Sequence, residues 1–315
     1  MSAYLALRRY GSRALETAAP VALGALLSAC VEMLQLFTPH RDCSAIDLMD
    51  NTIGSALGVA AGLVFVRVAD VPAVFTARFR PRDRCAVALL FCWAASLVFP
   101  LFPVMWLTVW RAKISAFVDA PVVNPAGVLL TAASWFAAGS LLAAAGVRSP
   151  RKWLTYLLVL VPAQFAIMNR FPAPSDFIGA AAGAVLFYFF GASQGADPIA
   201  GAALLFALAV SGLAPFHFEA RSQGFSWIPF GGFLNTDWQA GIQILLTKLF
   251  GYGASIWLLH RGGLGLLRAT ALVAVVLAGI EIIQTHTAGH VAEITDPLLA
   301  LLLGAGLTVL HRFRI

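Results

Sequence analysis

Three stretches of the chain carry the same polar residues at the same spacing. In each stretch a Gln is followed six residues later by Arg or His, and by Asp six residues after that. The three copies are Gln35, Arg41 and Asp47; Gln164, Arg170 and Asp176; and Gln284, His290 and Asp296. An amide, a guanidinium and a carboxylate together are suited to binding sugar hydroxyls and phosphates. The repeated pattern therefore predicts polar binding sites.

The first copy has the most complete set of polar groups. It adds Glu32 about one helix turn before its Gln, and Asn51 about one turn after its Asp. The middle copy has Val161 at the position of Glu32, and the last copy has Ala300 at the position of Asn51. We therefore expect any chemistry or ligand binding to belong to the first copy. Its candidate ligand-binding residues are Glu32, Gln35, Arg41, Asp47 and Asn51.

A carboxylate at Glu32 would be costly in a membrane. About one and a half helix turns below the surface, it costs several kcal/mol unless it is paired, protonated or hydrated. Arg41 and Gln35 are its nearest polar partners in sequence. Neutral groups would hold two helices together at lower cost, which favours a functional interpretation of this charged group.

The same motif also has a structural interpretation. The polar groups would form a hydrogen-bonded clasp between two helices, with each motif Asp serving as the N-cap of its helix. After the first motif come Gly54, Gly58 and Gly62, and small residues at this spacing let two helices pack closely in lipid. The surface through which the two helices pack would then also carry the polar residues of the motif.

Lys248 is a second costly residue, because it lies near the middle of an apolar run. It requires a carboxylate or water, and we expect it to pair with Glu281 on the next predicted helix. The alternatives are a lysine that reaches from the bilayer to its surface and a contact with an anionic substrate. The secondary candidate residues are Gln164, Arg170, Asp176, Lys248, Glu281, Gln284, His290 and Asp296.

Metal and cofactor sites have little support. His286, His290, Glu293 and Asp296 follow one another closely, but they match no established ligand spacing. The chain also has no Gly-x-Ser-x-Gly, phosphate-binding glycine loop or HExxH motif. We therefore expect no metal and no cofactor, and the sequence leaves open whether the protein is an enzyme.

The composition indicates that lipid, not water, surrounds most of the chain. Of 315 residues, 60% are hydrophobic and 11% are charged, whereas roughly a quarter are charged in a soluble domain. We predict an all-α polytopic integral membrane protein with about ten transmembrane helices. The predicted helices are 17–38, 46–66, 85–105, 126–146, 152–169, 176–192, 198–215, 239–260, 265–286 and 295–311.

Basic residues orient the predicted helices. The net charge of +6 would suggest a nucleic-acid partner in a soluble protein, but here Lys and Arg separate apolar runs. Most of the 21 basic residues fall on the side of the N-terminus, which places both termini in the cytoplasm. We expect a multi-pass protein of the inner (plasma) membrane, with membrane lipids and no nucleic acid as partners.

Two other segments allow alternatives. Arg8, Arg9 and Arg13 followed by an apolar run to Cys30 resemble a lipoprotein signal, but apolar sequence continues past Cys30 and indicates a retained first helix. The loops 106–125 and 216–238 carry several Trp residues. These loops suit an aromatic belt at the membrane surface, or a lid over an outward-facing site.

The motif residues resemble the signature of VanZ-like membrane proteins. That resemblance rests on Glu32, Gln35, Phe37, Arg41, Asp47, Asn51, Gly54 and Gly58, and on the segment Trp227-Ile228-Pro229-Phe230. It implies one partial unit at 1–84 and two four-helix units at 85–197 and 198–315. The even number of helices makes the units parallel. The family's namesake accompanies low-level teicoplanin resistance, so the resemblance also implies an effect on envelope antibiotic tolerance.

Three classes of function fit these observations. The first is an outward-facing site that binds or processes a lipid-linked or cell-envelope glycan. The second is a transporter with a polar pathway that contains Lys248 and Glu281. The third is a non-catalytic membrane scaffold whose motifs only clasp helices.

Overall fold

The computed structural model describes residues 13–35, 45–68 and 83–312, except residues 120, 122, 192, 194, 221, 223, 232–236 and 288. The chain divides into two compact units, Met1–Arg80 and Pro81–Ile315, and each is considered by itself. Most of the described residues are helical and none forms a β-strand, so the prediction of an all-α fold is confirmed.

The first unit contains a helical hairpin of α2 (Arg13–Gln35) and α3 (Ala45–Val68). The two helices approach closely at Gly24, where an added Cβ would lie 2.2 Å from the hydroxyl of Ser55. By contrast, a Cβ added at Gly54 would meet nothing within 4 Å. The close approach predicted at Gly54 is therefore absent there, and the close approach described for this hairpin is at Gly24.

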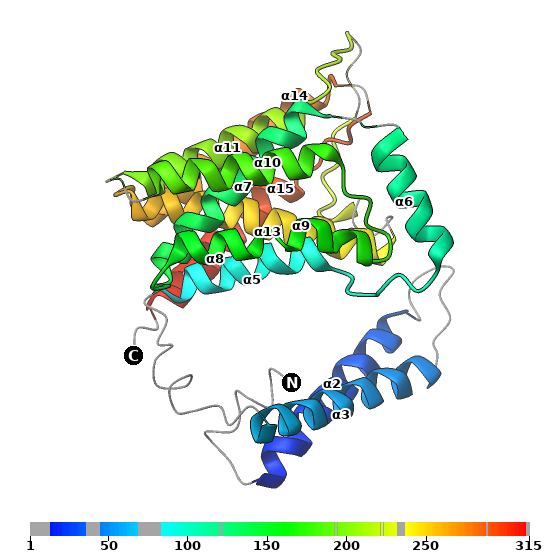
Figure 1. The fold of residues 1–315 in the computed structure, drawn as a ribbon. Coiled ribbons are helices and arrows are strands. Elements are labelled where there is room, and N and C mark those ends of the chain that lie inside the picture. Colours follow the sequence, from blue (N-terminus) through cyan, green and yellow to red (C-terminus); the bar gives the residue numbers. More distant parts are fainter. Residues whose placement is uncertain are drawn as a thin grey trace. The chain divides into compact units, whose positions relative to one another are not determined.

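The second unit is a bundle of helices that run back and forth between two ends (Figure 1). Its helices are α5 (Arg84–Val98), α6 (Leu107–Asp119), α7 (Pro125–Ala144), α8 (Pro150–Leu157), α9 (Leu160–Ala163), the 3-10 turn η1 (Gln164–Ala166), α10 (Pro174–Phe190), α11 (Ala196–Leu213), α13 (Trp238–Arg261), α14 (Leu266–Gln284) and α15 (Thr295–Arg312).

The core of the bundle forms around α7 and α13. The rings of Trp93 on α5 and Trp135 on α7 meet edge to face, with centroids 4.9 Å apart. Phe250 on α13 lies next to Trp93, at 6.3 Å between centroids. Gly183 of α10 allows close packing against α7, because a Cβ there would lie 2.3 Å from the carbonyl oxygen of Ala132.

Among the residues that the structure describes, four helices are long and apolar enough to cross a membrane: α7, α11, α13 and α14. Shorter apolar helices are α5, α10 and the segment Thr17–Val31 of α2. Large apolar side chains such as Phe91, Phe189 and Leu267 are exposed on the outside of the bundle, as expected for contact with lipid. The chain is therefore compatible with a helical membrane protein.

The helix predicted at 152–169 is not continuous. It is divided into α8, α9 and η1, and α8 ends just before Leu158. Pro162 lies four residues after Leu158, and the proline ring clashes with the carbonyl at that position and supplies no N–H to it. The helix predicted at 85–105 likewise ends at Val98, because Pro100 disfavours a helical conformation at Phe99.

Candidate functional site

The middle and last copies of the motif lie at one end of the second unit, which we call the motif end. Their connections, α9 to α10 through η1 and α14 to α15, are on the right in Figure 1. Each connection pairs with the loop that follows an earlier helix. Ile167 bridges to Pro103 after α5, and Thr287 bridges to Phe218 after α11. The motif segments are thus held by backbone contacts at corresponding places.

The middle copy brings its three polar residues together. The Nη2 of Arg170 donates a 2.6 Å hydrogen bond to Oε1 of Gln164, which is buried. The Oδ2 of Asp176 accepts a 2.8 Å hydrogen bond from the backbone N–H of Ala173, and its charge also acts on Arg170. Gln164, Arg170 and Asp176 form one group, as their spacing predicts.

This group lines a cavity of about 370 Å³. Thr131 and Trp135 of α7 line it from one side, and Gln243 of α13 lines it too. Asn169 also lines it and donates a 2.7 Å hydrogen bond to Oε1 of Gln239. Val161, which replaces the Glu of the first copy, contributes an apolar part of the wall. The cavity therefore combines amides, one guanidinium and one carboxylate with apolar surfaces.

Arg170 places a fixed positive charge in the cavity. Burial lowers the pKa of its guanidinium from its ordinary value, and the nearby Asp176 carboxylate raises it. A guanidinium stays protonated in proteins even after such a shift. The cavity thus retains this charge at any physiological pH.

Lys113 is a second cation beside this group that sequence reasoning did not single out. It comes from α6, is only 2% exposed, and donates hydrogen bonds to the carbonyl oxygens of Phe165, at 3.2 Å, and Ile167. Burial lowers the pKa of the Lys113 ammonium, and the charge of Arg170 lowers it further. Lys113 therefore holds the segment that carries both Gln164 and Arg170.

One signal in the sequence points to Lys113. Trp110 and Phe117 lie three residues before it and four residues after it, so the three share a helix face. The ring of Phe117 contacts those of Phe165 and Phe177, at 5.5 and 5.4 Å between centroids. A lysine between two aromatic residues of one face is expected to be drawn into a protein contact.

The last copy forms a different cluster from the one predicted. The ammonium of Lys248 pairs with Oδ1 of Asp296, not with Glu281 as expected. The hydroxyl of Tyr252, one helix turn further along α13, donates a 2.6 Å hydrogen bond to Oδ2 of the same carboxylate. Asp296 thus links α15 to α13 through two partners.

Glu281 is occupied by another contact. Its Oε2 accepts a 2.8 Å hydrogen bond from the backbone N–H of Glu293, in the connection between α14 and α15. It is buried, and Asp296 and Lys248 are its charged neighbours. The charges of Lys248 and Asp296 therefore act on Glu281, although Glu281 does not form the predicted ion pair with Lys248. We call Lys248, Tyr252, Glu281 and Asp296 the Lys248 cluster.

Gln284 contacts a different element from its counterpart Gln164 in the middle copy. The Nε2 of Gln284 donates a 2.6 Å hydrogen bond to the carbonyl oxygen of Gly212 on α11. His290 is half-buried in the turn that follows Thr287. In the described part of the chain, no group of three or more His, Cys, Asp or Glu residues could hold a metal ion.

Most of the first copy lies outside what the structure describes. Arg41 is outside the described residues, and of Glu32 and Gln35 only the backbone of α2 is described. Asp47 is exposed in the first turn of α3. The Nδ2 of Asn51 donates a 2.9 Å hydrogen bond to the hydroxyl of Ser28 on α2. Asn51 thus links the two helices of the hairpin, which is the clasping role described above.

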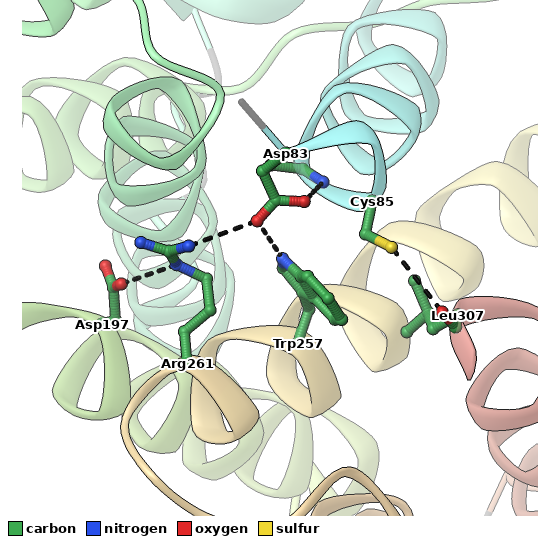
Figure 2. A network of polar contacts seen from close by, with 7 residues as sticks. Asp83, Cys85, Asp197, Trp257, Arg261 and Leu307 are labelled. Atoms are coloured by element: carbon green, nitrogen blue, oxygen red, sulfur yellow. Dashed lines mark hydrogen bonds and ion pairs between the residues drawn. The ribbon is translucent and has the colours of Figure 1, made fainter. Parts of the chain in front are cut away.

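A further polar network, not foreseen from the sequence, is shown in Figure 2. Its residues lie at the ends of α5, α11 and α13 that are opposite the motif end. The Oδ1 of Asp83 caps α5 by accepting from the N–H of Ala86, at 3.0 Å. Its Oδ2 accepts from Nε1 of Trp257 at 2.8 Å and from Nη1 of Arg261 at 3.3 Å. Nε of Arg261 donates to Asp197 at 2.8 Å. These bonds tie the ends of α5, α11 and α13 together.

None of the protein-family models, curated proteins or solved structures compared with this chain matches it. The resemblance to VanZ-like proteins accordingly stays a prediction from the motif residues.

Proposed function

We propose that this chain is a VanZ-like integral membrane protein that binds a lipid-linked or cell-envelope glycan at the motif end, through the anionic headgroup of that lipid. The observation that supports this most is the cavity of about 370 Å³, where Gln164 holds the guanidinium of Arg170 and the charge of Asp176 acts on it. The charge, the hydrogen-bonding groups and the size of the cavity each favour such a ligand.

The charge of the cavity region favours an anion. Two cations, Lys113 and Arg170, lie close enough to influence each other, and Asp176 is the carboxylate that acts on Arg170. A ligand phosphate would supply the missing negative charge and accept two parallel hydrogen bonds from a guanidinium. Lys113 is already engaged with backbone carbonyls, so Arg170 is the residue that would contact the phosphate directly.

The remaining polar groups favour sugar hydroxyls. The side-chain amides of Gln164, Asn169 and Gln243 line the cavity, and each amide both donates and accepts hydrogen bonds. Small-molecule sites commonly have volumes of about 300 to 1,000 Å³, so this cavity would hold a headgroup of one or two sugars with its phosphate. The lipid chain would remain in the bilayer.

Internal duplication would account for the corresponding contacts of the two motif connections. Asn169 and Gly289 occupy the same place in the repeated motif, and both have a positive φ, of 60° and 77°. The bridges of Ile167 and Thr287 also fall at the same place. These similarities support two parallel four-helix units at 85–197 and 198–315. With the bias of basic residues, they favour an outward-facing motif end and cytoplasmic termini in the inner membrane.

Binding to defined lipids tests this proposal. The purified full chain in detergent should bind a polyprenyl phosphate that carries one sugar at least about tenfold more tightly than the uncharged polyprenol. Arg170→Ala should remove this preference for the phosphate. Arg148→Ala removes an exposed arginine beyond the other end of α7 and should leave the preference unchanged. Equal binding of the two lipids by the unmodified protein would contradict the proposal.

Transport is a second candidate function, and the Lys248 cluster favours it. Ionisable groups inside apolar helices are costly and commonly mark substrate or proton pathways. Lys248, Asp296 and Glu281 form such a group on three helices, with Tyr252 beside them. Vesicles that contain the protein would then take up substrate with a rate that falls in Asp296→Asn, whereas a binding protein would show affinity without uptake.

A further inference from the structure

Helix α6 packs against the motif end through one narrow face. That face contains Trp110, Lys113 and Phe117, which are three and four residues apart. Lys113 donates to the carbonyls of Phe165 and Ile167, and Phe117 contacts the ring of Phe165. The helix is therefore attached to the bundle by a buried cation and aromatic contacts, and the rest of its surface lies free of the bundle.

A second face of α6 is apolar and exposed. Leu107, Ile114 and Val118 are seven and four residues apart, so they form one stripe along the helix. Their exposed fractions are 65%, 51% and 63%. Met105 and Trp106, just before the helix, are exposed as well and extend the same apolar region. Nothing in the described residues covers this stripe.

A third face of α6 is polar. Thr108, Arg111, Ser115 and Asp119 follow one another at helical spacing and are all exposed. The hydroxyl of Ser115 donates a 2.5 Å hydrogen bond to Asp119 within this face. The helix thus has separate sectors for protein contact, apolar contact and polar contact, which is the pattern of helices that lie on membranes.

The position of α6 also suits a membrane surface. It precedes α7, one of the helices long and apolar enough to cross a membrane, and it runs across the end of the bundle instead of along its helices (Figure 1). Its 13 residues span only about 20 Å, too short to cross a bilayer. Because α7 must start at a membrane boundary, a helix lying across its start runs along that boundary.

We infer that α6 lies in the plane of the membrane interface, with Leu107, Ile114 and Val118 inserted at the edge of the acyl chains. The polar stripe then faces the lipid headgroups, and Trp106 stands at the interface where tryptophan is favoured. The occupant of the apolar stripe is the bilayer itself. Lys113 joins this interfacial helix to the segment between Gln164 and Arg170.

Neighbouring positions on α6 give a matched test. In full-length protein whose native cysteines are replaced by Ser or Ala, Ile114→Cys and Ser115→Cys each receive a nitroxide spin label. The two proteins are reconstituted in vesicles of phosphatidylethanolamine and phosphatidylglycerol. The measurement is the collision rate of each label with oxygen, which concentrates in lipid, and with a water-soluble nickel chelate. We expect the Ile114 label to favour oxygen and the Ser115 label to favour nickel.

Other results overturn the inference. An Ile114 label as accessible to nickel as the Ser115 label would place the stripe in water. An Ile114 label protected from both reagents would place it against protein, such as a second copy of this chain. Val118→Cys repeats the test one turn further along, so that a local effect of one label cannot decide it. Circular dichroism and normal elution in gel filtration establish that each labelled protein is folded.

Discussion

Arg170 and Gln164, six residues apart in sequence, are joined by a 2.6 Å hydrogen bond that directs the guanidinium into the motif-end cavity. Gln164 lies in the short turn η1 and Arg170 in the connection after it, so neither is fixed by a long helix. Their geometry depends on contacts from α6 and from the loop after α5. Residues that would bind the ligand and residues that hold the binding segment in place should therefore respond differently to substitution.

Gln164 should orient Arg170 without supplying charge. Gln164→Ala should weaken binding of the sugar-bearing polyprenyl phosphate by about 10- to 150-fold, because a hydrogen bond to a charged group is worth about 1.5 to 3 kcal/mol. Gln164→Glu keeps an acceptor for Arg170 but adds a negative charge, so it should favour a neutral sugar lipid over the phosphate. Titration of the purified variants with both lipids checks this. Unchanged affinity in Gln164→Ala would mean that Arg170 needs no such support.

Lys113 should stabilise the motif end. Lys113→Met removes the Lys113 ammonium from the carbonyls of Phe165 and Ile167, and the Ile167 carbonyl keeps only a 3.4 Å hydrogen bond from the backbone N–H of Arg170. The variant should lower the free energy of unfolding by about 1 to 3 kcal/mol. Arg111→Met removes an exposed cation from the polar face of the same helix and should change stability by less than about 0.5 kcal/mol. Thermal unfolding in detergent compares the two. Equal effects would argue against the buried contact.

The protonation of Lys113 also predicts a pH dependence. Burial lowers the pKa of Lys113 in the folded protein, so between this pKa and the ordinary lysine value the unfolded chain binds more protons than the folded one. The free energy of unfolding therefore increases as the pH rises through this window. Lys113→Met should remove that part of the increase. Denaturation curves at several alkaline pH values measure it, and an unchanged slope in the variant would contradict the assignment.

The partner of Lys248 can be identified by double-mutant cycles. Combining Lys248→Met with Asp296→Asn should give a coupling energy of about 1 to 3 kcal/mol, since both groups are partly buried and in direct contact. Combining Lys248→Met with Glu281→Gln should give a smaller coupling, because Glu281 is engaged by the backbone of Glu293. The free energy of unfolding in each background is the measured quantity. A larger coupling with Glu281 would restore the pairing expected from sequence.

The network opposite the motif end should affect stability but not ligand binding. Arg261→Ala removes bonds to both Asp83 and Asp197, and we expect it to destabilise the protein by about 1 kcal/mol. Arg268→Ala removes an exposed arginine near the start of α14 and should be nearly neutral. Affinity for the polyprenyl phosphate should be the same in both variants. A loss of affinity in Arg261→Ala alone would show that the two ends of the bundle are coupled.

Much of the fold follows from local sequence patterns. Apolar runs of helical length predict the positions of α7, α11, α13 and α14, because such runs are stable only as helices in lipid. Two failures have local causes that can be read in the sequence. Pro162 divides the helix predicted at 152–169, and Pro100 ends the helix predicted to reach 105. The segment of α6 is predicted only as a loop, since it is short and mixes apolar with polar residues.

The sites were predictable only where the partners are close in sequence. The spacing of Gln164, Arg170 and Asp176 brings them together through one connection between helices. Lys248 and Asp296 are 48 residues apart, and depth along the helices does not distinguish Asp296 from Glu281, because both lie close to the motif end. Which of these two carboxylates contacts Lys248 depends on how α14 and α15 are rotated about their axes. Lys113 and Asp83 were missed for the same reason, since their partners come from distant segments.

In the proposed membrane protein, where α5 and α10 would span the bilayer, their lengths bear on the thickness of the surrounding lipid. These helices have 15 and 17 residues, which correspond to about 22 and 26 Å, whereas a typical hydrocarbon layer measures about 30 Å. Lipids beside short helices thin to match them at modest cost. Because Leu97 of α5 and Asp176 of α10 both line the motif-end cavity, this thinning would bring headgroups several ångströms nearer to Arg170. A lipid beside α5 and α10 would then present its headgroup closer to the cavity than a lipid in the undisturbed bilayer.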